Sequence, residues 1–371
     1  MITSIQIENF KSLKEIFMVT RNLNIFMGLN GMGKSSVIQA LLLMRQSREN
    51  NLRDLSLNGN LVEIGRGQDA LYQGAENEVI TINIGFNNGI TGDEDFLIEC
   101  SLDYQSENNV LTNSYDTSGL ELSQIPLFNN NFAYLEAERT GPQTDYSMSY
   151  KDVVENRQIG KRGQYAIHYL NHFGMNVTVP DTLSHPDAKS KTLLHQVIAW
   201  MGEISPDIRL ETQEISGTDK IILKYRFSTN DFTTRDFRPK NVGFGISYVL
   251  PIIVSLLSYE QDKLIIIENP EAHIHPRGQA RLGRLLALAA ASGMQIIVET
   301  HSDHILNGVR VAVKQSAISD EDVNISYFER VTTDEEQYCN VRPIFIYPNG
   351  SLSDYPADFM DEWQNQLKNL I

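Results

Sequence analysis

Apolar residues follow regular spacings near both ends of the chain and a weaker pattern between them. Residues 2–8 alternate in part between apolar and polar side chains, and residues 23–27 form a second apolar run, so we expect two early strands. After Ser35, apolar residues within 37–44 recur at i, i+3, i+4 and i+7, the spacing of one helix face. The chain therefore begins with a strand, a glycine-rich segment and a helix, in that order.

The pattern becomes regular again after residue 240. We expect a helix over 247–257, an apolar strand over 264–267, an Ala- and Leu-rich helix over 278–292 and another strand over 295–298. Strands and helices that alternate in this way, with almost unbroken apolar strands, are typical of a buried and largely parallel sheet.

The middle of the chain and its tail predict smaller elements. Between residues 50 and 240, short apolar runs such as 79–84 and 221–225 are separated by Asn, Gly and Ser, which predicts antiparallel strands and several helices. No heptad repeat runs through this region, so a long coiled-coil arm is not expected. Residues 324–349 indicate a small strand pair, and residues 356–370 a closing helix.

The glycine-rich segment carries the first chemical signal. Residues 28–35 read GLNGMGKS and match G-x-x-x-x-G-K-[ST], the phosphate-binding loop. Its glycines let backbone N–H groups face phosphates, Lys34 would reach the β- and γ-phosphates, and the Ser35 hydroxyl would ligate Mg²⁺. We therefore expect ATP and Mg²⁺ as cofactors. The expected contacts in this loop are Asn30, Gly31, Gly33, Lys34, Ser35 and Ser36.

Two later strands end in residues with matching chemistry. The strand over 264–267 leads into Glu268, whose carboxylate at a strand tip can hold Mg²⁺ opposite the loop serine, and Glu271 follows shortly after. The strand over 295–298 leads into His301, a candidate sensor of the γ-phosphate. A lone histidine at a strand end is more often structural, but its place after the other two motifs favours the functional interpretation.

A second phosphate site is predicted just before the helix at 247–257. Gly243, Gly245 and Ser247 lie at the expected helix start, where free N–H groups and the helix dipole attract anions. An ordinary capped helix, with Ser247 as its N-cap, is the simpler alternative. One subunit has no use for a second phosphate site, but a dimer that traps ATP between its subunits needs one.

These four motifs, in this order, resemble the ABC-type ATPases of the SMC, Rad50 and RecF group. The chain is most similar to compact bacterial members that lack the coiled coil and share a short, uncharacterised C-terminal domain. The resemblance implies a head-to-tail homodimer, or a higher oligomer, that encloses ATP, with Lys11 near the nucleotide and Gln68 next to Mg²⁺. The segments that carry it are 5–12, 57–61, 134–142, 242–247, 268–276, 299–302, 327–330 and 354–359.

The expected fold is thus an α/β P-loop NTPase of the ABC and SMC-head type, with a mixed, mostly parallel sheet and an antiparallel β subdomain. We divide the chain into four parts. They are the first part of the ATPase domain with its phosphate loop (1–50), an antiparallel β and helical insertion (51–240), the second part of the ATPase domain (241–323) and a small C-terminal domain (324–371).

One position departs from the family pattern. Typical ABC ATPases have Asp-Glu at the acidic strand, whereas this chain has Glu268-Asn269, so an amide replaces the residue that usually activates water. Asparagine cannot accept a proton, which predicts slow hydrolysis unless Glu271 acts in its place.

Composition narrows the range of partners. The 371 residues carry a formal net charge of −16, which repels nucleic acid unless a local basic patch overcomes it. Arg45, Arg48 and Arg53, or Lys161 and Arg162, are the candidates for such a patch, although solvated surface charge is the simpler interpretation. The two cysteines show no metal or disulfide spacing, and no apolar run of membrane-spanning length or signal peptide is apparent, so we expect a cytoplasmic protein.

An ATP-clamped dimer is a switch that can regulate another protein. No nuclease signature is present, so we favour control of a separately encoded effector, a nuclease or toxin, with nucleic acid bound only through the complex. The resemblance implies a context of anti-phage defence. The alternatives are a DNA-repair ATPase of the RecF kind that binds DNA directly, and a transporter subunit.

Overall fold

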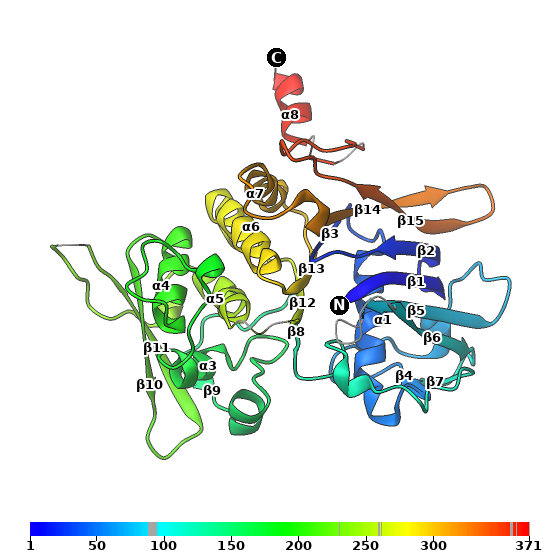
Figure 1. Cartoon of the computed structure of the whole chain (residues 1–371), viewed down its shortest axis with the longest axis horizontal. Coiled ribbons are helices and arrows are strands. Elements are labelled where there is room, and N and C mark those ends of the chain that lie inside the picture. The colour runs from blue at the N-terminus through cyan, green and yellow to red at the C-terminus, as the bar shows by residue number, and fades with distance from the viewer. Residues whose placement is uncertain are drawn as a thin grey trace. The chain divides into compact units, whose positions relative to one another are not determined.

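The computed structural model describes residues 1–87, 95–229, 231–258, 260, 262–356, 359–360 and 362–370. Its contacts group into two compact units, coloured mainly blue to cyan with orange to red, and green to yellow, in Figure 1. Unit 1 contains Met1–Asn129, Val323–Tyr347 and Ser351–Ile371, and unit 2 contains Asn130–Asp322 and Pro348–Gly350. Residues 51–129 of the expected insertion thus group with the N-terminus, while our boundaries at 50, 240 and 323 stay a prediction.

Unit 1 contains an antiparallel sheet in the order β2-β1-β5-β6-β7-β4. Its strands are β1 (Ile2–Phe10), β2 (Leu13–Val19), β4 (Asp54–Ser56), β5 (Val79–Asn87), β6 (Asp95–Asp103) and β7 (Val110–Asn113). The antiparallel β subdomain is therefore confirmed. We did not predict β2, because the exposed side chains of Phe17 and Val19 obscure its alternation of buried and exposed positions.

A second group of strands in unit 1 supports the glycine-rich loop. The wholly buried β3 (Leu23–Met27) leads into the loop, and α1 (Lys34–Gln46) follows it, as expected. β14 (Val323–Thr332) pairs in parallel with β3, and β15 (Gln337–Ile344) pairs antiparallel with β14. The predicted strand pair in the tail thus lies beside the loop strand.

Two short helices complete the elements of unit 1. They are α2 (Gly67–Ala70) and α8 (Glu362–Leu370), and the second falls within the closing helix expected over 356–370. Ala357 and Asp358, which belong to the C-terminal segment of the family resemblance, lie outside the described residues.

Unit 2 contains the two parallel strands predicted for the second part of the chain, together with a third parallel strand from the middle region, where we expected antiparallel strands. β13 (Gln295–Glu299), β12 (Leu264–Glu268) and β8 (Phe132–Leu135) are hydrogen-bonded in that order, and all run parallel. The helices α6 (Pro276–Ala291) and α7 (Asp303–Lys314) lie side by side, with each helix backbone close to a glycine of the other, at Gly283 and Gly308. Together with the mixed strand directions of unit 1, this confirms the α/β fold.

In the part of it that the structure describes, unit 2 contains three further α-helices and a second, antiparallel sheet. The helices are α3 (Ala166–Phe173), α4 (Leu193–Ile204) and α5 (Phe244–Leu257), and the strands β9 (Tyr146–Ser147), β10 (Ile208–Glu214) and β11 (Lys220–Phe227) form an antiparallel sheet in the order β10-β11-β9. Within the described residues, no helix is both long and apolar enough to cross a bilayer.

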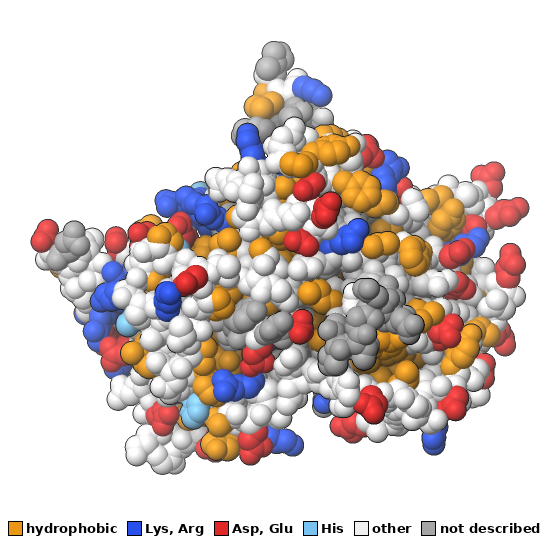
Figure 2. Space-filling model, in the orientation of Figure 1, with side chains coloured by type: hydrophobic (Ala, Val, Ile, Leu, Met, Phe, Trp, Pro, Cys, Tyr) orange, Lys and Arg blue, Asp and Glu red, His pale blue; other side chains and the backbone are white. Residues whose placement is uncertain are grey.

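The groups considered for a basic patch are largely engaged in other contacts. Arg45 is buried, and its Nη1 donates to the carbonyl oxygens of Leu127 and Asn129, both at 2.7 Å. Burial lowers the pKa of Arg45 to about 9. Lys161 and Arg162 each lie 3.4 Å from the carboxylate of Glu136. Figure 2 shows acidic side chains spread over the face in view, in keeping with the net charge of −16.

Candidate nucleotide site

The loop after β3 has the backbone shape that its glycines predict. Gly28, Gly31 and Gly33 have φ angles of 136°, 75° and 98°, a region that side-chain-bearing residues rarely adopt. A Cβ on Gly28 would lie 2.3 Å from the carbonyl oxygen of Phe328, so no side chain fits there. Successive backbone N–H groups in such a turn form a concave anion-binding site, which matches the phosphate-binding role.

Lys34 lies within this loop. Only 3% of the residue is exposed, and its Nζ donates to the carbonyl oxygens of Gly28 at 2.9 Å and Leu29 at 2.8 Å. The ammonium group is thus held against the loop, where its charge strengthens the attraction for an anion. Asn30 and Ser35 are exposed at the loop and at the start of α1, and Ser36 is buried in the first turn of that helix.

Lys11 is brought to the same region of unit 1. Its Nζ donates to Oε1 of Gln39 on α1 at 2.7 Å, and its backbone N–H donates to the carbonyl of Ala70 at 2.7 Å. Burial lowers the pKa of Lys11, and the charge of Asp69 partly offsets this effect. Gln68 is exposed on α2, two residues before Ala70. The structure therefore places Lys11 and Gln68 on neighbouring backbone, while their roles at the nucleotide and at Mg²⁺ stay a prediction.

Glu268 in unit 2 is held by groups that the motifs did not reveal. Tyr134 donates its hydroxyl to Oε1 at 3.0 Å, and the backbone N–H of Ala137 donates to Oε2 at 3.3 Å. Burial, and then the charge of Glu299 opposite it on β13, raises the pKa of Glu268 to about 7. The Oδ1 atom of Asn269 is buried and has no hydrogen-bond partner among the described residues. Carboxylate and amide oxygens are both types of ligand that Mg²⁺ accepts, and these two residues are consecutive in the chain.

Glu271 orients the segment that carries His301. Its Oε2 accepts a hydrogen bond from the Thr300 hydroxyl at 2.7 Å, and its Oε1 accepts one from the backbone N–H of His301 at 2.8 Å. Both carboxylate oxygens are therefore engaged, which favours a positioning role for Glu271 over that of a free general base. His301 itself is exposed at the end of β13.

The helix at the second expected phosphate site begins earlier than the sequence indicated. Its N-cap is Gly243 and its first residue is Phe244, so Ser247 lies inside the first turns and is not an N-cap. Ser247 is 5% exposed and its hydroxyl is buried, which contradicts our placement of this residue at an open helix start. Gly243 is exposed at the helix N-terminus and Gly245 is half-buried within the first turn, so these two glycines keep the expected position.

Arg139 is a residue of this region that motif analysis missed. It is 1% exposed, and its guanidinium donates to four carbonyl oxygens. These belong to Tyr248 (3.1 Å), Glu136 (3.0 Å), Glu268 (2.7 Å) and Asn269 (2.7 Å). Arg139 thus ties α5 to the turn after β12. The only sequence signal was its place in segment 134–142 of the family resemblance.

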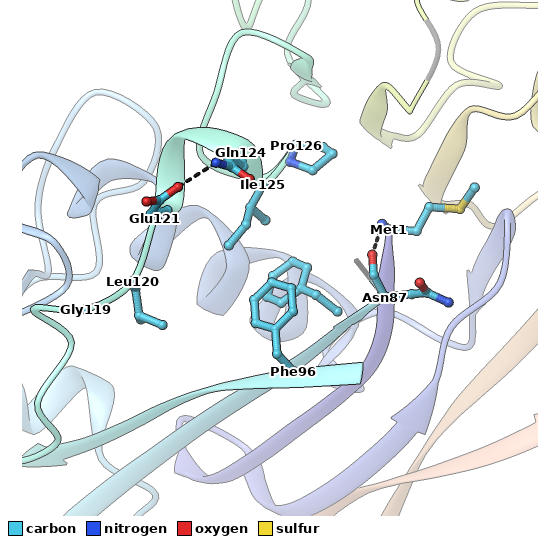
Figure 3. Close-up of a pocket in the computed structure, with 10 residues that line it drawn as sticks. Met1, Asn87, Phe96, Gly119, Leu120, Glu121, Gln124, Ile125 and Pro126 are labelled. Carbon is cyan, nitrogen blue, oxygen red and sulfur yellow. Dashed lines mark hydrogen bonds between the residues drawn. The ribbon is translucent and has the colours of Figure 1, made fainter. Parts of the chain in front are cut away.

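A separate pocket lies at the other end of β1. It has a volume of about 380 Å³ and is lined by Met1, by the stacked rings of Phe86 and Phe96, and by residues from 119–126 (Figure 3). Met1 precedes β1 and Lys11 follows it, so nine extended residues, about 30 Å, separate the pocket from Lys11. This pocket is not the predicted nucleotide site.

Three family models match successive parts of the chain. Residues 1–172 match a family described as an AAA ATPase domain, and residues 189–307 match one described as an AAA domain, putative AbiEii toxin, type IV TA system. Residues 318–370 match a family described as a protein of unknown function, DUF3696. No curated protein sequence matches the chain.

Solved structures of SMC heads share the fold. One is a crystal structure of the SmcHead bound to the C-winged helix domain of ScpA, with 13% identity, coverage of 92% of this chain and 98% of that chain, and a TM-score of 0.56. Another is an Smc head domain with an extended coiled coil bound to the C-terminal domain of ScpA derived from Pyrococcus furiosus. It has 13% identity, coverage of 100% and 99%, and a TM-score of 0.52. At these identities the likeness establishes the fold.

Proposed function

We propose that this SMC-like ABC ATPase, which joins AAA ATPase segments on an SMC-head fold to a DUF3696 segment, binds ATP with Mg²⁺ and closes as a dimer in the cytoplasm. The closed dimer then switches a separately encoded effector. The single observation that carries nucleotide binding is the loop itself, with three glycines at positive φ and Lys34 held against the carbonyl groups of Gly28 and Leu29.

Mg²⁺ would take the Ser35 hydroxyl and the Glu268 carboxylate as oxygen ligands, with Gln68 as a further candidate. When bound, the ion neutralises the charge that develops on the phosphates. His301 would contact the γ-phosphate, and Glu271 would hold the backbone of His301 in place through its two hydrogen bonds.

Hydrolysis in this proposal is slow. Asn269 replaces the usual base, and Glu271 already accepts hydrogen bonds from Thr300 and His301 through both oxygens, which favours a positioning role for it. A long-lived ATP state suits a switch, because the closed form then persists until a second signal ends it.

The descriptions of similar proteins support a protein partner for this ATPase. The matched family over 189–307 is described as a putative toxin of a toxin–antitoxin system, and both SMC heads were solved with ScpA bound. These descriptions support an ATPase that works with another protein, and we infer a nuclease or toxin of anti-phage defence as the effector. Direct DNA binding of the RecF kind is less well supported, because Arg45, Lys161 and Arg162 are already engaged.

Nucleotide binding is tested by calorimetry with ATP and Mg²⁺ on the Lys34→Ala variant. We expect a loss of at least roughly tenfold in affinity, because a buried cation that faces phosphate is removed. Lys189→Ala, which removes an exposed lysine of unit 2, is the matched control and should bind as the natural chain does. Equal affinity in Lys34→Ala would contradict the proposed site.

Dimer closure is tested at Gly243. A side chain fits there, since the nearest atom to a Cβ is 3.9 Å away, and Asp is a good N-cap, so Gly243→Asp should fold normally. Its charge should repel the γ-phosphate and abolish ATP-dependent dimers in sedimentation experiments. Gly243→Asn, which has the same shape without the charge, should retain more dimer. Dimers of equal strength in the Asp variant would rule out this mode of closure.

A further inference from the structure

The C-terminal hairpin of unit 1 forms part of the wall around the phosphate loop. β14 continues beyond its last pair with β3, Tyr327 with Met27, and so runs on past the loop. The Phe328 carbonyl fills the space where a side chain of residue 28 would lie, and the Sγ of Cys339 on β15 would lie 2.9 Å from a Cβ on Gly33. Both strands of the hairpin therefore contact the loop.

Arg330 is the charged residue that this hairpin brings to the loop. Its side chain is exposed, and its Nη2 donates to the carbonyl oxygen of Gly31 at 3.0 Å. Neither the phosphate-loop motif nor any of the other three motifs includes this residue, which is 299 positions away from Gly31 in the sequence.

This hydrogen bond engages the carbonyl side of the peptide group between Gly31 and Met32. All described peptide bonds are trans, so the Gly31 carbonyl and the Met32 N–H point in opposite directions from the same plane. Gly31 has a φ of 75° and no side chain, so it restricts the orientation of this peptide less than another residue would. When Arg330 holds the carbonyl, the Met32 N–H points away from the guanidinium.

We propose that Arg330, supplied by the C-terminal hairpin, is a positioning residue of the nucleotide site, which fixes the peptide between Gly31 and Met32 so that its N–H is ready to bind phosphate. The proposal rests on nucleotide binding at the loop. It gives the C-terminal segment a direct part in that site, and it makes the affinity for nucleotide depend on the placement of the hairpin.

The turn of the hairpin is itself anchored, which keeps Arg330 in place. Lys14 on β2 lies 2.6 Å from the carboxylate of Glu336, and the Tyr72 hydroxyl donates to the same carboxylate at 3.2 Å. Burial and the hydrogen bond to Glu336 raise the pKa of Tyr72, so the phenol remains a donor at neutral pH. The hairpin is thus held at its turn and at the loop.

The test compares Arg330→Met, Arg330→Lys and the matched control Arg342→Met, which removes an exposed arginine from the neighbouring strand β15. ATP affinity is measured by calorimetry, and amide hydrogen exchange is followed over residues 28–33 without nucleotide. We expect Arg330→Met to lose about threefold to tenfold in affinity, the value of one ordinary hydrogen bond, because this one is exposed to solvent. The variant should also exchange faster in the loop. Arg330→Lys should recover part of the ATP affinity and part of the protection of the loop from exchange, and the control should change neither quantity.

Two results would overturn the proposal. One is an Arg330→Met variant with natural affinity and natural loop exchange, and the other is an equal loss in Arg342→Met. Lys34→Ala, run in parallel, keeps this outcome separate from the proposed function. If Lys34→Ala loses affinity while Arg330→Met does not, only the role of Arg330 is wrong, whereas a natural chain without affinity for ATP refutes the proposed function itself.

Discussion

Removal of the Arg139 guanidinium should damage unit 2 more than any change at its surface. Arg139→Met keeps an unbranched apolar chain of similar length but leaves four carbonyl oxygens without their donor, at Tyr248, Glu136, Glu268 and Asn269. A buried polar group without a partner costs roughly 1–3 kcal/mol, but such costs are not additive and the arginine also loses its own desolvation penalty. We therefore expect a loss of about 3–5 kcal/mol in the free energy of unfolding.

Thermal and chemical unfolding measure this loss. In a domain of this size, each kcal/mol of lost stability lowers the thermal unfolding midpoint by about 2–4 °C, so the midpoint should fall by roughly 10 °C. The unfolding midpoint of Arg139→Lys should lie between those of the natural chain and Arg139→Met. Burial already lowers the pKa of Arg139 to about 10, and a lysine has one nitrogen for four carbonyl groups. Arg281→Met is the matched control, because it breaks only the half-exposed ion pair with Glu203 and should cost less than about 1 kcal/mol.

The loss of stability in Arg139→Met should appear in two specific segments of unit 2. Arg139 joins α5 to the turn after β12, so amide exchange should rise in 244–248 and 268–269 together and stay unchanged over β10 and β11. A change in midpoint no larger than that of Arg281→Met would show that the four hydrogen bonds do not stabilise unit 2. So would increased exchange in only one of the two segments.

Three further outcomes follow from the site. Burial raises the pKa of Glu268 to about 7, so the folded protein binds this proton more tightly than the unfolded chain and loses up to about 3 kcal/mol of stability as pH rises from 4.5 to 7. Glu268→Gln should remove that loss, so its unfolding free energy should exceed that of the natural chain at pH 8 but not at pH 4. Equal stability at pH 8 would contradict the buried charge. The same variant should also lose Mg²⁺-dependent nucleotide affinity. Asn269→Glu should raise the ATP turnover rate by at least roughly tenfold if position 269 faces the attacking water, and an unchanged rate in a phosphate-release assay would place it elsewhere. Gly28→Ala should cost about 2–4 kcal/mol and most nucleotide affinity, because its Cβ would lie 2.3 Å from the Phe328 carbonyl; wild-type binding would mean that the loop and β14 can separate easily.

Local chemistry accounts for the parts of the structure that the sequence predicted. The phosphate loop depends on glycines within eight consecutive residues, so its shape is encoded in the motif, and Gly28, Gly31 and Gly33 adopt it. Wholly buried strands such as β3 and β13 appear as largely apolar runs, because both of their faces are covered. In each case the signal and the structure it specifies lie in one short stretch of chain.

The contacts that sequence reasoning missed join distant segments. Arg139 binds carbonyl groups about 110 and 130 residues further on, and Arg330 reaches back 299 residues to Gly31. Ser247 occupies the residue type and spacing of an N-cap, but the helix begins at Phe244 and buries its hydroxyl, an outcome set by tertiary packing. The spacing of residues in a single sequence does not reveal such pairings, because they depend on which elements pack together.

The residues of the proposed site fall into two groups, and we expect changes in the two groups to affect different steps of its function. The phosphate loop, Lys11 and Arg330 belong to unit 1, whereas Glu268, Glu271, His301 and Gly243 belong to unit 2, and each group is held by hydrogen bonds within its own unit. Changes in the first group should therefore act mainly on nucleotide affinity. Changes at Glu271, His301 or Gly243 should act on turnover and on dimer closure while affinity persists, because these residues lie outside the loop that binds phosphate, whereas Glu268 acts on affinity through Mg²⁺.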